Sequence, residues 1–211
     1  MLNPKRILVL APHTDDGELG CGATIAKFLE AGAEVFYVAF STAEESVPAG
    51  FPKNQLEVEL KAATQVLGIK PENVIVFKYE VRKLNYVRQE ILEKLIELKP
   101  KIKPDFVFLP STKDIHQDHT TIANEGIRAF KACTILGYEL IWNNLSFNTD
   151  CFIEVTPSQL QKKIDALQAY KTQEGRAYMD PKFIESLAMV RGTQIGKQFA
   201  ETFEVIRWII S

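Results

Sequence analysis

The chain has 211 residues and a formal net charge of −2, from 25 lysines and arginines, 27 aspartates and glutamates and three neutral histidines. Hydrophobic residues make up 46% of it and charged residues 25%, a composition that is typical of globular domains and excludes an intrinsically disordered chain. The near-zero charge excludes the basic surface of a nucleic-acid-binding protein, and no stretch approaches the roughly 20 apolar residues of a membrane span.

Length and cysteine usage point to one domain in a reducing compartment. The length and the even composition predict a single domain over residues 1–211. Cys21, Cys133 and Cys151 are scattered, odd in number and without a C-x-x-C pair, which argues against a disulfide framework. The apolar run at 7–11 is too short for the core of a signal peptide. We therefore expect a cytoplasmic protein.

Short apolar runs alternate with helical periods through the first half of the chain. Strands are predicted at 7–11, 34–41, 73–79 and 105–110. Helices are predicted at 23–31, 55–67 and 85–99. Gly32 and Gly68 end the first two helices. Asn85 is the expected N-cap of the third, and Pro100 and Pro104 are expected to end it.

The second half continues with a helix predicted at 120–133 and strands at 138–142 and 152–155. A helix from Pro157 to Tyr170 follows, with Thr156 as its N-cap. A polar loop at 171–180, a helix at 183–190 and a last strand at 202–210 complete the prediction.

Strands that alternate with helices, in runs apolar enough to be buried on both sides, indicate an α/β fold. We expect a mostly parallel sheet with helices on both faces. Such folds bind ligands beyond the carboxyl ends of the strands, where the strand order reverses. In the common order 3-2-1-4-5, that position lies between the first and fourth strands. Functional residues are therefore expected just after residue 11 and just after residue 110.

All three histidines of the protein lie in these two loops, with acids beside them. The first loop holds His13 with Asp15 and Asp16, and the second holds His116, Asp118 and His119. Two imidazoles and one carboxylate form a catalytic zinc site when one position stays open, and a second carboxylate can serve as general base. His13, Asp16 and His119 are candidate ligands, and Asp118 is placed to orient His116.

Each loop taken alone has a simpler explanation. A histidine near a strand end is more often a hydrogen-bonded structural residue than a ligand, and an aspartate before a helix is usually an N-cap. On that interpretation Asp15 or Asp16 caps the first helix, and Asp118 or Thr120 caps the fourth. The occurrence of both loops at the predicted position favours the metal site.

Two glycine-rich segments offer rival interpretations. Gly17–Gly22 follows a strand and opens a helix, as a dinucleotide-binding turn does, but its spacing is G-x-x-G-x-G and not G-x-G-x-x-G. Gly192–Lys197 is one residue short of a phosphate loop and has no Ser or Thr after its lysine. The first segment keeps a nucleotide-binding module as an alternative, and the second is set aside.

The two histidine loops resemble the motifs of a known family. Pro12-His13-Thr14-Asp15-Asp16 is similar to the PHPDD(E) motif of the PIG-L/LmbE-like zinc-dependent N-deacetylases, and His116-Gln117-Asp118-His119 is similar to their HPDH motif. Weaker similarities extend over most of the chain, at 20–27, 59–68, 152–156 and 200–203. Thr14 and Gln117 stand in place of prolines, Gly17 in place of a glutamate, and Leu56 near a position that is often basic.

This resemblance implies a Rossmann-like fold and hydrolysis of an N-acetyl group on a small glucosamine-type or related amino-sugar conjugate. It implies that a Zn²⁺ ion is held by His13, Asp16 and His119. Asp15 would be the general base. His116 would stabilise the oxyanion or protonate the leaving amine, with Asp118 tuning it.

Three hypotheses follow from the sequence. The leading one is a zinc-dependent N-deacetylase, and the others are a nucleotide-binding module and a metal-binding but non-catalytic family member. His and Asp ligands also accept iron or cobalt, and relatives often assemble, which leaves a homo-oligomer open. No nucleic-acid partner is expected.

Overall fold

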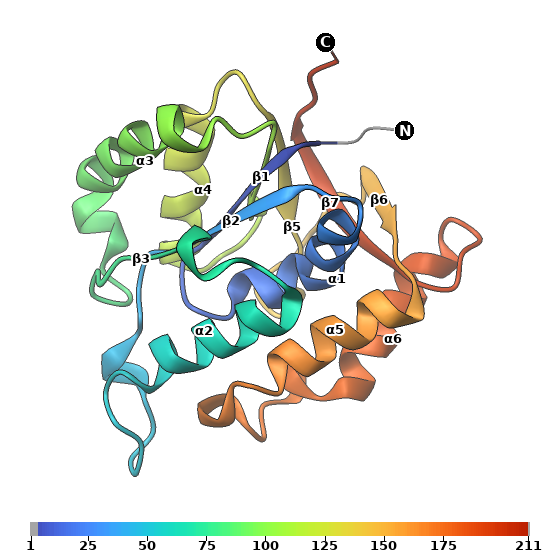
Figure 1. Cartoon of the computed structure of the whole chain (residues 1–211), viewed down its shortest axis with the longest axis horizontal. Helices are drawn as coiled ribbons and strands as arrows, with labels where there is room; N and C mark the ends of the chain where they lie inside the picture. The colour runs from blue at the N-terminus through green and yellow to red at the C-terminus, as the bar shows by residue number, and fades with distance from the viewer. Residues whose placement is uncertain (1–3, 211) are drawn as a thin grey trace.

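The computed structural model describes residues 4–210, which form one seven-stranded sheet between two layers of helices (Figure 1). The strand order is β3-β2-β1-β4-β5-β7-β6. The first five strands in this order are parallel, and β7 runs antiparallel to both β5 and β6. The strands are β1 (Arg6–Ala11), β2 (Glu34–Ala39), β3 (Val74–Val76), β4 (Phe106–Pro110), β5 (Thr134–Tyr138), β6 (Cys151–Glu154) and β7 (Ala200–Arg207).

Helices cover both faces of the sheet and bury a separate core on each. One layer contains α1 (Asp16–Glu30), α2 (Gln55–Leu67), α5 (Pro157–Leu167) and α6 (Pro181–Thr193). The other contains α3 (Arg88–Ile102) and α4 (Gln117–Ala129). None of these helices, which are those of the described part of the chain, is both long and apolar enough to cross a membrane.

The central strand β1 shows why the sheet is covered on both sides. Ile7 and Val9 point into the first core, whereas Leu8 and Leu10 point into the second, and all four are fully buried. A strand with apolar side chains on both faces is stable only when both faces are covered. The expected parallel sheet and the order 3-2-1-4-5 are therefore confirmed, with two antiparallel strands added at one edge.

Several predicted boundaries are confirmed by their capping residues. The helix α2 has the predicted ends, and Gly68 ends it with a φ of +95°, a conformation that glycine adopts without steric cost. The helix α5 begins with a capping box, in which the Thr156 side chain accepts from the Gln159 N–H and the Gln159 side chain accepts from the Thr156 N–H.

The prediction for 85–99 was wrong at both ends. Residues 84–87 form a short 3₁₀ turn, so Asn85 does not cap the helix, and α3 begins at Arg88. Pro100 lies inside the last turn of the helix. Its missing N–H removes one backbone hydrogen bond, and this loss is offset because continuing the helix buries the Ile102 side chain in the second core. The helix ends at Ile102, and its C-cap Lys103 has a φ of +50°.

Two other elements are displaced from their predicted ranges. The fifth strand was predicted at 138–142, but β5 is Thr134–Tyr138, because this segment is buried and pairs with β4. The first helix was predicted from residue 23, but α1 begins at Asp16 and is kinked at Cys21, whose φ is −147°. The loop after β1 therefore passes directly into α1.

Candidate active site

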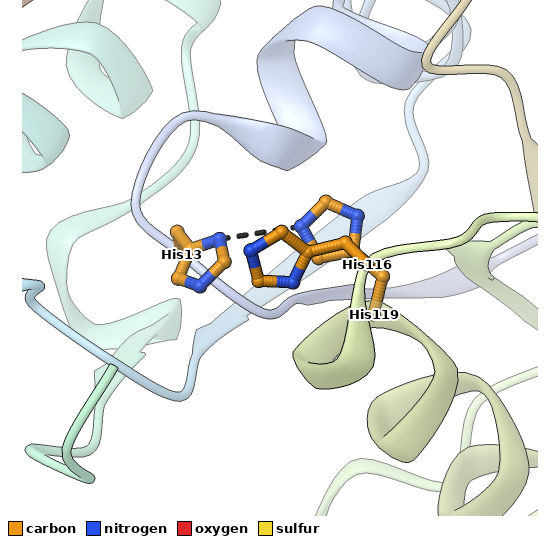
Figure 2. Close-up of side chains that lie close together, drawn as sticks. All are labelled: His13, His116 and His119. Carbon is orange, nitrogen blue, oxygen red and sulfur yellow. Dashed lines mark hydrogen bonds between the residues drawn. The ribbon is translucent and has the colours of Figure 1, made fainter. Parts of the chain in front are cut away.

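The two histidine loops meet at the carboxyl ends of β1 and β4, which are neighbours in the sheet. His13 comes from the loop after β1, and His116 and His119 come from the start of α4 (Figure 2). The side chains point toward one another, and one ring nitrogen of each lies within 4.8 Å of the others. The three histidines thus form a group that could hold a metal ion, at the predicted position.

Asp16 completes a tighter set of donor atoms with two of these histidines. His13 Nδ1 lies 3.1 Å from Asp16 Oδ2 and 3.2 Å from His119 Nε2. His119 Nε2 lies 3.3 Å from the same Asp16 oxygen. Ligand atoms at about 2.0–2.1 Å from a tetrahedral ion are roughly 3.3 Å apart, so the three atoms have the mutual spacing of one face of a tetrahedral site.

The other ring nitrogen of each of these histidines is held by a buried carboxylate. His13 Nε2 lies 3.0 Å from Asp118 Oδ2, and His119 Nδ1 lies 2.7 Å from Asp114 Oδ2. Such carboxylate partners fix the orientation of an imidazole ligand and increase its basicity. Asp114 did not emerge from the sequence as a site residue; its only signal was an acid two residues before His116.

The expected pairing of Asp118 with His116 needs correction. The Asp118 carboxylate bonds to His13 and to the backbone N–H groups of Arg82 (2.6 Å) and Leu84 (3.1 Å). His116 is instead the N-cap of α4, and its Nδ1 accepts the backbone N–H of Asp118 at 3.2 Å. Asp118 therefore orients His13 through its side chain and His116 through its main chain.

Carboxylates and imidazoles stabilise each other's charged forms at the centre of the site. Burial disfavours the charged imidazole of His13, but Asp16 and Asp118 outweigh it and raise the pKa of His13 to about 9. The pKa of His119 is raised to about 10, because Asp16 and Asp114 likewise outweigh burial. Burial would raise the pKa of Asp16, yet His119 and His13 hold that pKa well below its usual range. A bound cation would therefore displace protons from the imidazoles.

Asp15 and His116 lie beside this centre in an open cleft of about 320 Å³. Burial and the adjacent Asp16 raise the pKa of Asp15 to about 6, so its carboxylate is ionised near neutral pH yet basic enough to accept a proton. Burial and the neighbouring His119 and His13 lower the pKa of His116. Since Nδ1 of neutral His116 accepts a hydrogen bond, its Nε2 carries the proton.

A buried network of polar side chains holds the loop that follows β1. Tyr37 Oη and Tyr170 Oη lie 2.9 and 2.7 Å from the Thr14 carbonyl oxygen, and both hydroxyls contact the Glu18 carboxyl group. Glu18 is completely buried, and burial raises its pKa to about 8. Sequence analysis did not identify this network, although an acid within the apolar start of α1 was a signal for it.

The kink in α1 is stabilised by a buried ion pair. Beyond Cys21, the backbone N–H of Thr24 donates to Glu201 on β7 at 2.7 Å. Lys163 on α5 bonds to Glu201 Oε1 and to the Leu19 carbonyl oxygen, each at 2.6 Å. The backbone groups freed by the kink are therefore paired on both sides of it.

The glycines of the 17–22 segment allow close packing. A Cβ atom at Gly17 would overlap the ring of Tyr37, and one at Gly20 would overlap the ring of Tyr138. The Gly17 N–H already donates to Tyr37 Oη at 3.1 Å. Because these groups are occupied by the protein itself, this geometry does not favour the nucleotide-binding hypothesis.

Structural comparison shows a shared fold. The N,N'-diacetylchitobiose deacetylase of Pyrococcus horikoshii superposes with a TM-score of 0.80 at 22% identity, over 96% of this chain and 84% of that one. A 4-carboxy-2-hydroxymuconate hydratase of Pseudomonas putida has the same TM-score at 19% identity, over 98% of both chains. The fold alone therefore does not decide the reaction.

Sequence comparison identifies the family. The chain is 26% identical to the uncharacterized deacetylase YaiS of Escherichia coli, over 80% of this chain and 91% of that protein. It is 25% identical to a probable N-acetyl-alpha-D-glucosaminyl L-malate deacetylase 2 of Bacillus anthracis, over 82% and 83%. Residues 8–131, more than half of the chain and including both histidine loops, match the family described as PIG-L: GlcNAc-PI de-N-acetylase. The chain therefore belongs to the PIG-L family.

Proposed function

We propose that this protein is a zinc-dependent hydrolase that removes the N-acetyl group from a small amino-sugar conjugate. The observation that carries the proposal is the set of three donor atoms from His13, Asp16 and His119, each 3.1–3.3 Å from the next. Membership of the PIG-L family and the deacetylase names of its relatives support this reaction class.

His13, Asp16 and His119 would hold the metal, because two imidazoles and one carboxylate leave a fourth position open to the cleft. Zinc suits this donor set, and each imidazole has the carboxylate partner that metal-bound histidines require. When bound, zinc supplies a Lewis acid that polarises the acetyl carbonyl and makes water nucleophilic near neutral pH. His116 belongs to the same histidine group, but we assign it to proton transfer.

Asp15 and His116 would divide the proton transfers of the hydrolysis. Asp15 takes a proton from the attacking water as its oxygen bonds to the acetyl carbon. A hydrogen bond from Nε2 of neutral His116 stabilises the developing oxyanion. For His116 to protonate the departing nitrogen instead, it must first take up the proton that Asp15 removed from water. The carbon–nitrogen bond then breaks as the nitrogen receives the proton that Asp15 removed from water, either directly or through His116. The products are a free amino sugar and acetate, whose remaining proton goes to solvent, and both residues return to their starting forms.

Metal content tests the assignment. We expect about one zinc per chain in the purified protein, a large loss in His119→Ala and retention in His116→Ala, with acetate release from N-acetylated sugars abolished in both variants. Gln117→Ala is the matched control, because this neighbour is exposed. Loss of metal in His116→Ala, with retention in Asp16→Asn, would exclude the proposed ligand set. Stoichiometric zinc with no acetate release would instead favour the non-catalytic hypothesis.

A further inference from the structure

Arg82 lies at the edge of the catalytic cleft in a fixed and strained conformation. It lines the cleft beside the histidines, and its φ of +65° is in the left-handed region, which costs a non-glycine residue on the order of 1 kcal/mol. Its backbone N–H donates to Asp118, the same carboxylate that holds His13. The base of the Arg82 side chain is thereby fixed relative to the metal centre, and the residue as a whole is exposed.

Arg176 reaches the same cleft from the loop between α5 and α6. Its Nη1 donates to Tyr178 Oη at 2.7 Å, and its Cζ lies 5.8 Å from the centre of the Tyr178 ring. The Tyr178 ring stacks on Trp142 at 4.2 Å with an interplanar angle of 16°. The cleft therefore has an aromatic wall with a guanidinium attached to it, as suits a sugar ring that carries a polar substituent.

The Arg176 loop is anchored at its start. Buried Glu59 on α2 accepts from the Thr172 hydroxyl at 2.6 Å and from the Thr172 N–H at 3.1 Å. Tyr170 is bonded to the Thr14 carbonyl oxygen of the metal loop at 2.7 Å. These contacts fix the start of the loop next to the proposed catalytic residues, so the segment that carries Arg176 is held at the side of the cleft.

Among the described residues, Arg82 and Arg176 differ from four other arginines of the protein in having no ion pair with a carboxylate. Arg6, Arg88, Arg128 and Arg191 each form an ion pair with a carboxylate. Within residues 4–210, no such pair involves Arg82 or Arg176, although Asp15 lines the same cleft. Two cations of this part of the chain thus line the cleft without a close ion pair, although the charge of Arg176 is near enough to Asp15 to oppose the rise in the pKa of that carboxyl group. A guanidinium binds carboxylate and phosphate through paired hydrogen bonds.

We propose that Arg82 and Arg176 form a subsite for an anionic group, so that the amino-sugar substrate carries a carboxylate or phosphate beyond its N-acetyl group. The proposal rests on the proposed function, because the sugar must place its acetyl group at the metal centre while its substituent reaches the arginines. Trp142 and Tyr178 pack against the sugar ring between these two points.

The test compares three substrates by acetate release from the zinc-loaded protein. N-acetylglucosaminyl L-malate carries carboxylates, N-acetylglucosamine 1-phosphate carries a phosphate, and N,N'-diacetylchitobiose is neutral. We expect kcat/KM for at least one anionic substrate to exceed that for the neutral one by about tenfold or more. The preferred anionic substrate distinguishes carboxylate from phosphate recognition.

Variants then assign the preference to the two arginines. Arg82→Gln and Arg176→Gln are each expected to lower kcat/KM for the anionic substrate by roughly 10- to 100-fold, mainly through KM, as expected for a lost charged hydrogen bond. The neutral substrate should change less than about threefold. Arg88→Gln, which alters an arginine paired with Glu125 outside the cleft, is the matched control and should behave like the parent. Equal losses on neutral and anionic substrates would show that the arginines act through Asp15, and would overturn the subsite.

Direct measurement of ligand binding tests the arginine subsite independently of the proposed deacetylase activity. Calorimetry with glucosamine 1-phosphate, glucosaminyl L-malate and glucosamine needs no turnover. We expect at least one anionic ligand to bind more tightly than glucosamine, and the Arg82→Gln/Arg176→Gln double variant to lose that difference. Equal affinities in the parent would overturn the subsite, whereas absence of acetate release with intact anion binding would contradict only the deacetylase assignment.

Discussion

Asp15 is the proposed general base and is not one of the proposed metal ligands. It lies next to Asp16 in the chain, but the closely spaced donor atoms come from Asp16, His13 and His119. The change Asp15→Asn keeps the shape of the side chain and removes its proton affinity. We expect turnover to fall by roughly 10²- to 10⁴-fold, the usual contribution of a general base, with the zinc content unchanged. Acetate release and metal analysis on the same preparation measure both quantities.

An exposed aspartate outside the cleft provides the control for Asp15→Asn. Asp165 on α5 is exposed, accepts a hydrogen bond from Gln161 within its own helix and is not among the residues that line the cleft, so Asp165→Asn should leave turnover within a factor of two. Near-normal turnover in Asp15→Asn would refute the assignment of the base. A loss of zinc in that variant would mean that Asp15 contributes to the metal site.

At the residue scale, the sequence identified the side chains that meet but not all of their partners. The three histidines were recognisable because a parallel sheet brings the ends of two neighbouring strands together, wherever those strands lie in the chain. The partner of Asp118 was misassigned because His116 is near it in sequence, whereas the Asp118 carboxylate accepts from the ring of His13, 105 residues away. Sequence proximity does not tell which way a carboxylate points at the start of a helix.

At the scale of a single helix, α1 carries a titratable group that should make stability depend on pH. Burial raises the pKa of Glu18 from 4.5 to about 8, so the folded protein favours the protonated form. The stabilisation is complete below about pH 4.5 and is lost as pH rises through about 8. Since each pKa unit corresponds to about 1.4 kcal/mol, the metal-free protein should lose several kcal/mol over this range from Glu18.

Glu18→Gln isolates this effect, because an amide has the shape of the protonated acid but does not ionise. In urea unfolding of metal-free protein, we expect the variant to be within about 1 kcal/mol of the parent at pH 5 and more stable than the parent at pH 8.5. Glu72→Gln, at an exposed position, should follow the parent at both values. Parallel pH dependence in the parent and Glu18→Gln would contradict the assignment.

The elements were predictable where local chemistry decides their ends. Gly68 and the Thr156 capping box mark the ends of α2 and α5 in the sequence itself. Pro100 misled the prediction for α3, because burial of Ile102 outweighs the hydrogen bond that proline removes. The kink at Cys21 was not predictable, since Glu201 and Lys163, which stabilise it, come from distant parts of the chain.

At the scale of the whole molecule, the proposed metal site lies where the two halves of the sheet meet. The loop after β1 connects to α1 in one helical layer, and the loop after β4 connects to α4 in the other. The parallel order of the first five strands, and hence the position of this junction, followed from strand–helix alternation. The antiparallel placement of β7 between β5 and β6 did not, because the pattern of apolar residues carries no information on strand direction at a sheet edge.

Because a metal at this junction binds only the folded chain, its removal should lower the unfolding temperature. A ligand at 100 times its Kd stabilises by about 2.7 kcal/mol, which corresponds to roughly 5–10 °C for a chain of this size. The gap between zinc-loaded and chelated protein should widen from pH 6.5 to pH 8.5. The pKa values of His13 and His119 are raised to about 9 and about 10 in the metal-free protein, so both imidazoles hold protons that the metal must displace, and that displacement becomes easier as pH rises.

The same two imidazoles also decide whether the metal-free protein gains or loses stability as pH rises. Their raised pKa values give stability that is complete below the unfolded pKa of about 6.5 and is lost as pH rises through about 9–10, so chelated protein weakens over the range in which zinc binds better. Scanning calorimetry of both forms at the two pH values measures the gap. His119→Ala, which lacks a proposed ligand, should show little response to chelator at either pH. A gap that narrows with pH, or an equal response in His119→Ala, would mean that zinc stabilises the fold from another place.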